Sequence, residues 1–240
     1  MEKLTVTNLG VSALTIQGGN RRIMVDAFNS VNQPTEVLPG DLILFTHDDD
    51  DHFRAEKLPE LKGIEVTIVG PPSIVKPILM LGKADIAQLE CLSTGDNSVP
   101  TSISFGDIHI KCYHTTHFNG WDPIHNSYLL EISGKRLYIT GDSLFTKELA
   151  ETIGNTDAVI CNLVEEGFLK GYTEGNIAIH HLLSYLLKLK AEGKTEQIIG
   201  VHLVNCPWTP DAEELNKLIK EYDFQGIVLP TSIEQNIILF

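Results

Sequence analysis

Residues 46–52, Thr-His-Asp-Asp-Asp-Asp-His, lie where the short apolar run of residues 41–46 ends. That run is continuous rather than alternating, which is typical of a strand buried on both faces. Rigid scaffolds often present functional side chains from loops at strand ends. Imidazole suits zinc and iron, and carboxylate suits harder ions, so the loop predicts a metal-binding active site. The two flanking histidines disfavour a merely solvated acidic turn.

The bulk composition indicates one globular domain spanning residues 1–240. Of 240 residues, 42% are hydrophobic, which is enough for one large core. The net charge of −14 disfavours nucleic acid and anionic membranes as partners and leaves a small-molecule substrate as the expected one. The start of the chain does not resemble a signal peptide, and the four cysteines are scattered, so we expect a cytoplasmic protein with reduced thiols. Homo-oligomerisation stays open.

The order of expected elements indicates two sheets. Strand-like runs at residues 4–8, 11–17 and 22–26 open the chain, and a Gly-Gly-Asn turn at 18–20 predicts a hairpin between the last two. A second batch of strands follows, and helices are expected at residues 177–190 and 211–222. Two batches of strands, each closed by helices, predict an α/β (α+β) fold. We expect a four-layer αββα sandwich with the sheets face to face.

Three further strands are expected to end on a metal-binding type of side chain. The run 108–113 ends on His114, the run 136–140 ends on Gly141-Asp142-Ser143, and the run 197–201 ends on His202. A lone histidine at a strand end is more often structural than functional. Together with residues 46–52, however, these positions form a set of imidazoles and carboxylates that four strand ends deliver.

This set, in this order, resembles the metallo-β-lactamase fold superfamily over nearly the whole chain. The opening strands that lead to Asp26 fit the same pattern, and the short interval before Gly141-Asp142 most resembles the compact members near the L-ascorbate-6-phosphate lactonases. The resemblance implies one or two divalent metal ions (zinc, manganese or iron). The implied ligands are His47, Asp49 and His114 for the first ion, Asp51, His52 and His202 for the second, and Asp142 between them.

The resemblance also implies a mechanism. A metal-held hydroxide would be the nucleophile, and Asp51 would be a catalytic group that receives a proton. Asp26 would hydrogen-bond a ligand imidazole and fix its orientation. His117 is an alternative to His114, which we prefer because it ends its strand directly. His117, His180 and His181 are candidates for substrate contact, with a structural role for the last two about equally plausible.

Two positions depart from the family pattern. The usual loop is His-x-His-x-Asp-His, and here Asp49 replaces the second histidine. A carboxylate oxygen makes the first site harder, which favours manganese or iron relative to zinc, and the flavodiiron branch has a glutamate there and binds iron. Alternatively, only the second site fills. Val11 stands where many compact relatives have a histidine.

The expected function is therefore a metal-dependent hydrolase that cleaves an ester, lactone or phosphodiester bond of a small substrate. The alternatives are a di-iron or manganese redox protein of the same fold and a non-catalytic metal-binding relative. The redox alternative is weakened because we expect no flavin-binding domain in this chain.

Overall fold

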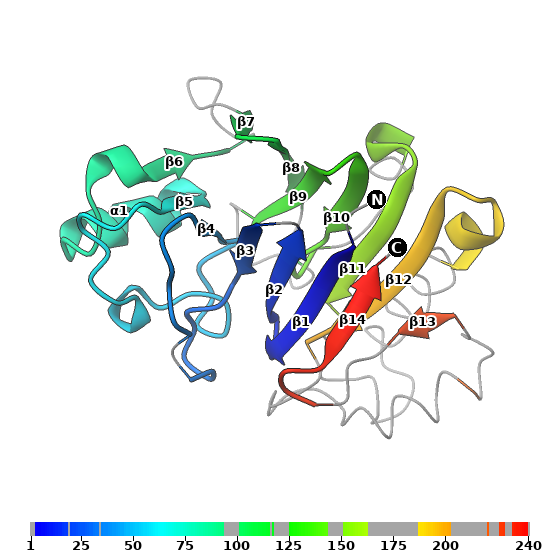
Figure 1. The fold of residues 1–240 in the computed structure, drawn as a ribbon, viewed down its shortest axis with the longest axis horizontal. Coiled ribbons are helices and arrows are strands. Elements are labelled where there is room, and N and C mark those ends of the chain that lie inside the picture. Colours follow the sequence, from blue (N-terminus) through cyan, green and yellow to red (C-terminus); the bar gives the residue numbers. More distant parts are fainter. Residues whose placement is uncertain are drawn as a thin grey trace.

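Two seven-stranded sheets form the centre of the protein (Figure 1). The computed structural model describes residues 3–18, 20–33, 35–93, 101–115, 117, 125–143, 151–162, 187–202, 220, 226–228 and 232–239. The first sheet has the order β14 (Asn236–Leu239), β1 (Leu4–Gly10), β2 (Ala13–Gly18), β3 (Arg21–Val25), β4 (Leu42–Leu44), β5 (Thr67–Gly70) and β6 (Leu89–Cys91). The second has the order β13 (Ile227–Val228), β12 (Thr195–Val201), β11 (Thr156–Asn162), β10 (Lys135–Ile139), β9 (His125–Ile132), β8 (Ile108–Thr115) and β7 (Ser102–Phe105).

Both sheets follow the same plan. In the first, β14, β1, β2 and β3 pair antiparallel, and β3 to β6 pair parallel. In the second, β7 to β10 pair antiparallel, and β10 to β13 pair parallel. Because parallel strands end at the same edge of a sheet, each sheet offers a row of carboxyl ends where side chains from several strands meet.

The main core lies between the two sheets. It combines buried side chains of the first sheet, such as Val25 and Leu44, with those of the second, such as Leu130 and Ile160. Alternation places Ile43 on the opposite face of β4, where a second cluster includes Ile74 of helix α1 (Pro72–Met80). The strand β4 is therefore buried on both faces, as its continuous apolar run predicts.

The helices supply an outer layer. Helix α1 and the 3-10 helix η1 (Ala55–Lys57) pack on the outer face of the first sheet, and the 3-10 helix η2 (Ile86–Gln88) precedes β6 (Figure 1). The predicted α/β fold with two large facing sheets is confirmed. Most residues of the helices expected at 177–190 and 211–222 lie outside the described residues, although residues 187–191 are helical.

The two ends of the chain meet in the first sheet. Strand β14 pairs antiparallel with β1, with Leu4 opposite Leu239. Sequence analysis missed β14, which completes the sheet from the far end of the chain. Among the described residues, no helix has the length and apolar character needed to cross a membrane.

Candidate metal centre

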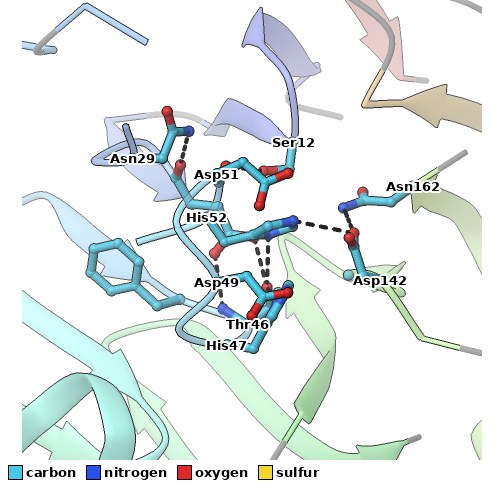
Figure 2. A network of polar contacts seen from close by, with 12 residues as sticks. Ser12, Asn29, Thr46, His47, Asp49, Asp51, His52, Asp142 and Asn162 are labelled. Carbon is cyan, nitrogen blue, oxygen red and sulfur yellow. Dashed lines mark hydrogen bonds and ion pairs between the residues drawn. The ribbon is translucent and has the colours of Figure 1, made fainter. Parts of the chain in front are cut away.

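Polar side chains from both sheets meet at the carboxyl ends of the parallel strands (Figure 2). From the first sheet, Asp26 follows β3 and the loop of residues 46–52 follows β4. From the second, Asp142 follows β10 and His202 follows β12. The backbone joins the two sheets here, because the amide of Asn126 in β9 donates to the carbonyl of Thr46 over 3.1 Å.

A tight turn shapes the loop that follows β4. The carbonyl of Asp49 accepts from the amides of His52 and Phe53 over 2.9 and 2.8 Å. The Phe53 ring is buried and packs edge-on against Phe45, with the ring centroids 4.9 Å apart. An apolar residue at each end thus anchors the acidic loop to the core, while the polar residues between them point to the strand-end edge.

Asp26 organises the two imidazoles of this loop. Its buried carboxylate accepts from the Thr46 amide over 2.9 Å, from the Thr46 hydroxyl over 2.7 Å and from His52 Nδ1 over 2.8 Å. Because a carboxylate only accepts, Nδ1 of His52 bears the proton. The Thr46 hydroxyl, which donates to Asp26, accepts from Nδ1 of His47 over 2.9 Å. Both rings therefore present Nε2 to the site, in the arrangement that orients metal-binding histidines.

We call His47, Asp49 and His117 half-site one. Oδ2 of Asp49 lies 3.6 Å from Nε2 of His47 and 3.3 Å from Nε2 of His117. Both imidazoles are buried, whereas the Asp49 side chain is 48% exposed and gives this half-site access to solvent. The neighbouring imidazoles of His117 and His47 hold the pKa of Asp49 well below its usual range, so this carboxylate is ionised at neutral pH.

We call Asp51, His52 and His202 half-site two. Oδ2 of Asp51 lies 3.1 Å from Nε2 of His202, and the rings of His52 and His202 are stacked with centroids 5.4 Å apart. The backbone of His202 has a positive φ of 75°, and its amide donates to the carbonyl of Val11 over 2.9 Å. Val11 and Asp26 also have positive φ values, 50° and 49°. Such uncommon backbone conformations often occur at functional sites.

Asp142 lies between the two half-sites. Its Oδ1 is 3.2 Å from Nε2 of His52, and its Oδ2 is 3.9 Å from Nε2 of His117 and 3.8 Å from Nε2 of His202. Burial alone would raise the pKa of Asp142, but the imidazoles of His52 and His202 outweigh it and hold the pKa well below the usual range. An ionised carboxylate thus faces both groups of ligand-type side chains.

His52 shows that this site favours a positive charge. Burial alone would lower its pKa, but Asp142 on one side and Asp26 on the other raise the pKa well above its usual range. The position of Nε2 therefore stabilises either a proton or another cation. Within the described part of the chain, Nε2 of His47 and Nε2 of His52 are buried and form no hydrogen bond of good geometry. Buried ring nitrogens of this kind are what a metal ion would bind.

The donor set fits two divalent ions. Ligand atoms lie within 4.8 Å of one another in three groups: half-site one, half-site two, and Asp142 with His47 and His52. Each half-site offers two imidazole nitrogens and one terminal carboxylate, and Asp142 lies between the half-sites. Three carboxylates, together with imidazoles that are neutral when they bind a metal ion, leave a net negative charge that two divalent ions would offset.

The structure places His117, and not the preferred His114, in half-site one. His114 is exposed on β8, whereas His117 is buried and lies in half-site one. The physical reason is that the chain beyond β8 forms an isolated β-bridge between His117 and Ser143, next to Asp142. The end of the strand is therefore not the point of closest approach to Asp142, although sequence analysis assumed that it was.

The remaining candidates have different outcomes. His47, Asp49, Asp51, His52, Asp142 and His202 are all brought together, and Asp26 contacts His52. His180 and His181 lie outside the described residues. Two further residues contact Asp142, and neither was among the predicted site residues. His125 accepts from the Asp142 amide over 3.0 Å, and the Asn162 side chain donates to Oδ1 of Asp142 over 2.6 Å (Figure 2).

Comparison with known proteins identifies the family. Residues 5–187 match the model of the Beta-lactamase superfamily domain, so the chain belongs to this family and has the metallo-β-lactamase fold. A curated relative, a metal-dependent hydrolase of Staphylococcus aureus strain MRSA252, is 22% identical over 187 residues, which are 72% of this chain and 79% of the relative.

Two solved structures illustrate the range of proteins with this fold. A protein of Parabacteroides distasonis assigned as a metal-dependent hydrolase is 20% identical, with a TM-score of 0.63 over 95% of this chain and 92% of that one. CmlA, a diiron β-hydroxylase from Streptomyces venezuelae, is 13% identical, with a TM-score of 0.66 over 99% of this chain and 54% of that one. At these identities the similarity shows the fold alone.

Proposed function

We propose that the protein is a metal-dependent hydrolase in which the two half-sites hold two divalent ions that share Asp142. The observation on which this rests is the position of Asp142, whose Oδ2 lies at nearly equal distances, 3.9 and 3.8 Å, from an imidazole of each half-site. The family relationship and the relative from Staphylococcus aureus that is named a metal-dependent hydrolase support the same activity.

The ions would polarise the bond to be cleaved and lower the pKa of a water molecule towards neutrality. The protein's own residues then have distinct tasks. Asp26 and Thr46 orient the imidazoles of His47 and His52 so that Nε2 of each faces the site. Burial raises the pKa of Asp51, but the neighbouring imidazoles of His202 and His52 lower it overall. Asp51 is therefore ionised and able to accept a proton from the attacking water.

We further propose that the substrate is a small molecule with an ester, lactone or phosphodiester bond. The net charge of −14 supports a small substrate rather than a nucleic acid, whose phosphates the protein would repel. Asp49 contributes a carboxylate oxygen to half-site one, where the family pattern has a third imidazole nitrogen. Because oxygen is the harder donor, we propose that manganese or iron binds there in preference to zinc.

One observation favours a second candidate, a di-iron or manganese redox protein. With Asp49 in place of histidine, each half-site has the same donor set of two imidazoles and one terminal carboxylate. Two imidazoles and one carboxylate are the ligands of many non-haem iron oxygenases. The fold that the chain shares with the diiron enzyme CmlA is compatible with this chemistry.

The test combines metal analysis with activity. The protein would be purified without added metal, analysed for its elements, and assayed on matched ester, lactone and phosphodiester substrates before and after chelation. The hydrolase predicts about two divalent ions per chain and a chelator-sensitive cleavage of at least one substrate class. Bound iron with a visible absorption band that bleaches on reduction, and no hydrolysis, would instead support the redox protein. Bound metal without either property would indicate a non-catalytic relative.

A further inference from the structure

The two carboxylate oxygens of Asp142 have different surroundings. Oδ1 accepts a hydrogen bond of 2.6 Å from Nδ2 of Asn162 and lies 3.2 Å from Nε2 of His52 (Figure 2). Oδ2 faces His117 and His202, one imidazole from each half-site, at 3.9 and 3.8 Å. The carboxylate is therefore held in one rotational orientation, with the amide on one oxygen and the two half-sites on the other.

Asn162 occupies a rigid position in the second sheet. It is the last residue of β11, which pairs parallel with β10 and β12, the strands that lead to Asp142 and His202. Its backbone amide donates to the hydroxyl of Thr140 over 3.2 Å, and that hydroxyl donates to the carbonyl of Gly141 over 2.7 Å. The backbone of Asn162 is thus tied to the segment whose side chain it contacts.

His125 fixes a different part of Asp142. Its Nδ1 lies 2.7 Å from the Thr115 hydroxyl, and its Nε2 accepts from the Asp142 backbone amide over 3.0 Å. Because the Asp142 amide donates, Nε2 of His125 carries no proton, and the ring proton lies on Nδ1. His125 therefore sets where the Asp142 backbone lies. Among the described residues, Asn162 donates the side-chain hydrogen bond that sets how the carboxylate is turned.

The chemical type of Asn162 suits a carboxylate that must also bind cations. A lysine or arginine would donate to Oδ1 equally well, but its charge would pair with Asp142 and repel a metal ion. A neutral amide donates a hydrogen bond while leaving the negative charge of Asp142 available. Asparagine also has the short, stiff side chain needed to hold a single orientation from a neighbouring strand.

We propose that Asn162 is a positioning residue that turns Asp142 so that Oδ2 is presented to both half-sites as a shared ligand atom. This inference rests on the proposed function, because it concerns how the two ions are held. It assigns to Asn162 no contact with the substrate.

Mn²⁺ titration of Asn162→Leu, followed by electron paramagnetic resonance, tests the proposal. Leucine has nearly the same shape as asparagine and lacks the donor. Supporting groups of this kind typically contribute about 10- to 100-fold to metal affinity. We therefore expect wild type to bind two Mn²⁺ per chain with an exchange-coupled spectrum. The variant should bind the pair about 10- to 100-fold more weakly, with weaker coupling at matched occupancy. If Asn162→Leu does not fold, Asn162→Ala removes the same donor with a smaller side chain.

A matched control separates positioning from general damage to the fold. Gln88 is also a buried amide at the end of η2, and its Nε2 donates to the carbonyls of Leu61 and Ile64, which belong to neither half-site. Gln88→Met should lower thermal stability without changing Mn²⁺ affinity or coupling. Equal losses in both variants would overturn the proposal.

The outcomes also separate this proposal from the function on which it rests. Unchanged affinity and coupling in a folded Asn162→Leu, with two ions bound by wild type, would overturn the role of Asn162 and leave the proposed function intact. Failure of the wild-type protein to bind Mn²⁺ in either half-site would refute the manganese-binding dinuclear site and, with it, the role of Asn162.

Discussion

Replacement of Asp26 by asparagine should weaken metal binding without removing any ligand. The carboxylate accepts three hydrogen bonds, two from Thr46 and one from Nδ1 of His52. An asparagine that keeps its oxygen towards the Thr46 amide turns its NH₂ group towards Nδ1–H of His52, so two donors meet. The imidazole is then driven to the tautomer with its proton on Nε2, the atom that half-site two needs for a metal ion.

The size of the effect follows from the bond that is lost. A hydrogen bond to a charged group contributes about 1.5–3 kcal/mol. Since about 1.4 kcal/mol corresponds to a tenfold change in Kd, we expect metal affinity at half-site two to fall about tenfold to a hundredfold. The assay is competition for Zn²⁺ or Mn²⁺ against a chromophoric chelator, with metal-free samples checked by circular dichroism.

Asp41→Asn is the matched control for Asp26→Asn. Asp41 is also a buried aspartate and lies at the opposite end of β4, where it accepts from Arg22 Nε over 2.9 Å and from the Leu38 amide over 2.7 Å. Its substitution should destabilise the fold but leave metal affinity unchanged. Unchanged affinity in a folded Asp26→Asn, or an equal loss in Asp41→Asn, would refute the reasoning about the His52 tautomer.

Three further predictions follow from the same site. A chelator should lower the unfolding temperature in a thermal melt by roughly 5–10 °C for each site that was filled at a hundredfold excess over Kd, because such binding stabilises by about 2.7 kcal/mol; an unchanged melt would contradict the presence of bound metal. His117→Ala should lose the ion of half-site one, whereas His114→Ala should keep both ions in elemental analysis; the reverse result would restore His114 as the ligand. Asp49→His should shift competitive binding from Mn²⁺ towards Zn²⁺, because a nitrogen donor replaces an oxygen; no shift would show that Asp49 does not bind the metal.

Much of the site could be predicted because its residues are local in sequence or stand directly at strand ends. The loop of residues 46–52 alone supplies His47, Asp49, Asp51 and His52, and a buried apolar strand precedes it. A continuous apolar run indicates a buried strand, and a polar loop directly after it indicates where that strand reaches the surface. The two patterns together locate the end of the strand. Asp142 and His202 follow the same rule.

The choice between His114 and His117 could not be made in this way. It depends on the bridge between His117 and Ser143, a pairing of two segments that are distant in the chain. Asn162 was missed for another reason. A neutral amide is not a typical metal ligand, and at the end of a buried strand it is chemically ordinary until its parallel neighbour is known to lead to Asp142. Strand β14 is short, and its pairing with β1 likewise depends on tertiary structure.

In the proposed metal centre, two ions share Asp142 between the two half-sites. Anomalous scattering from crystals of the protein grown with Mn²⁺ measures this most directly. We expect two peaks per chain, one beside His47, Asp49 and His117 and the other beside Asp51, His52 and His202, with Asp142 touching both. A single peak, or a peak coordinated by His114 in place of His117, would contradict it.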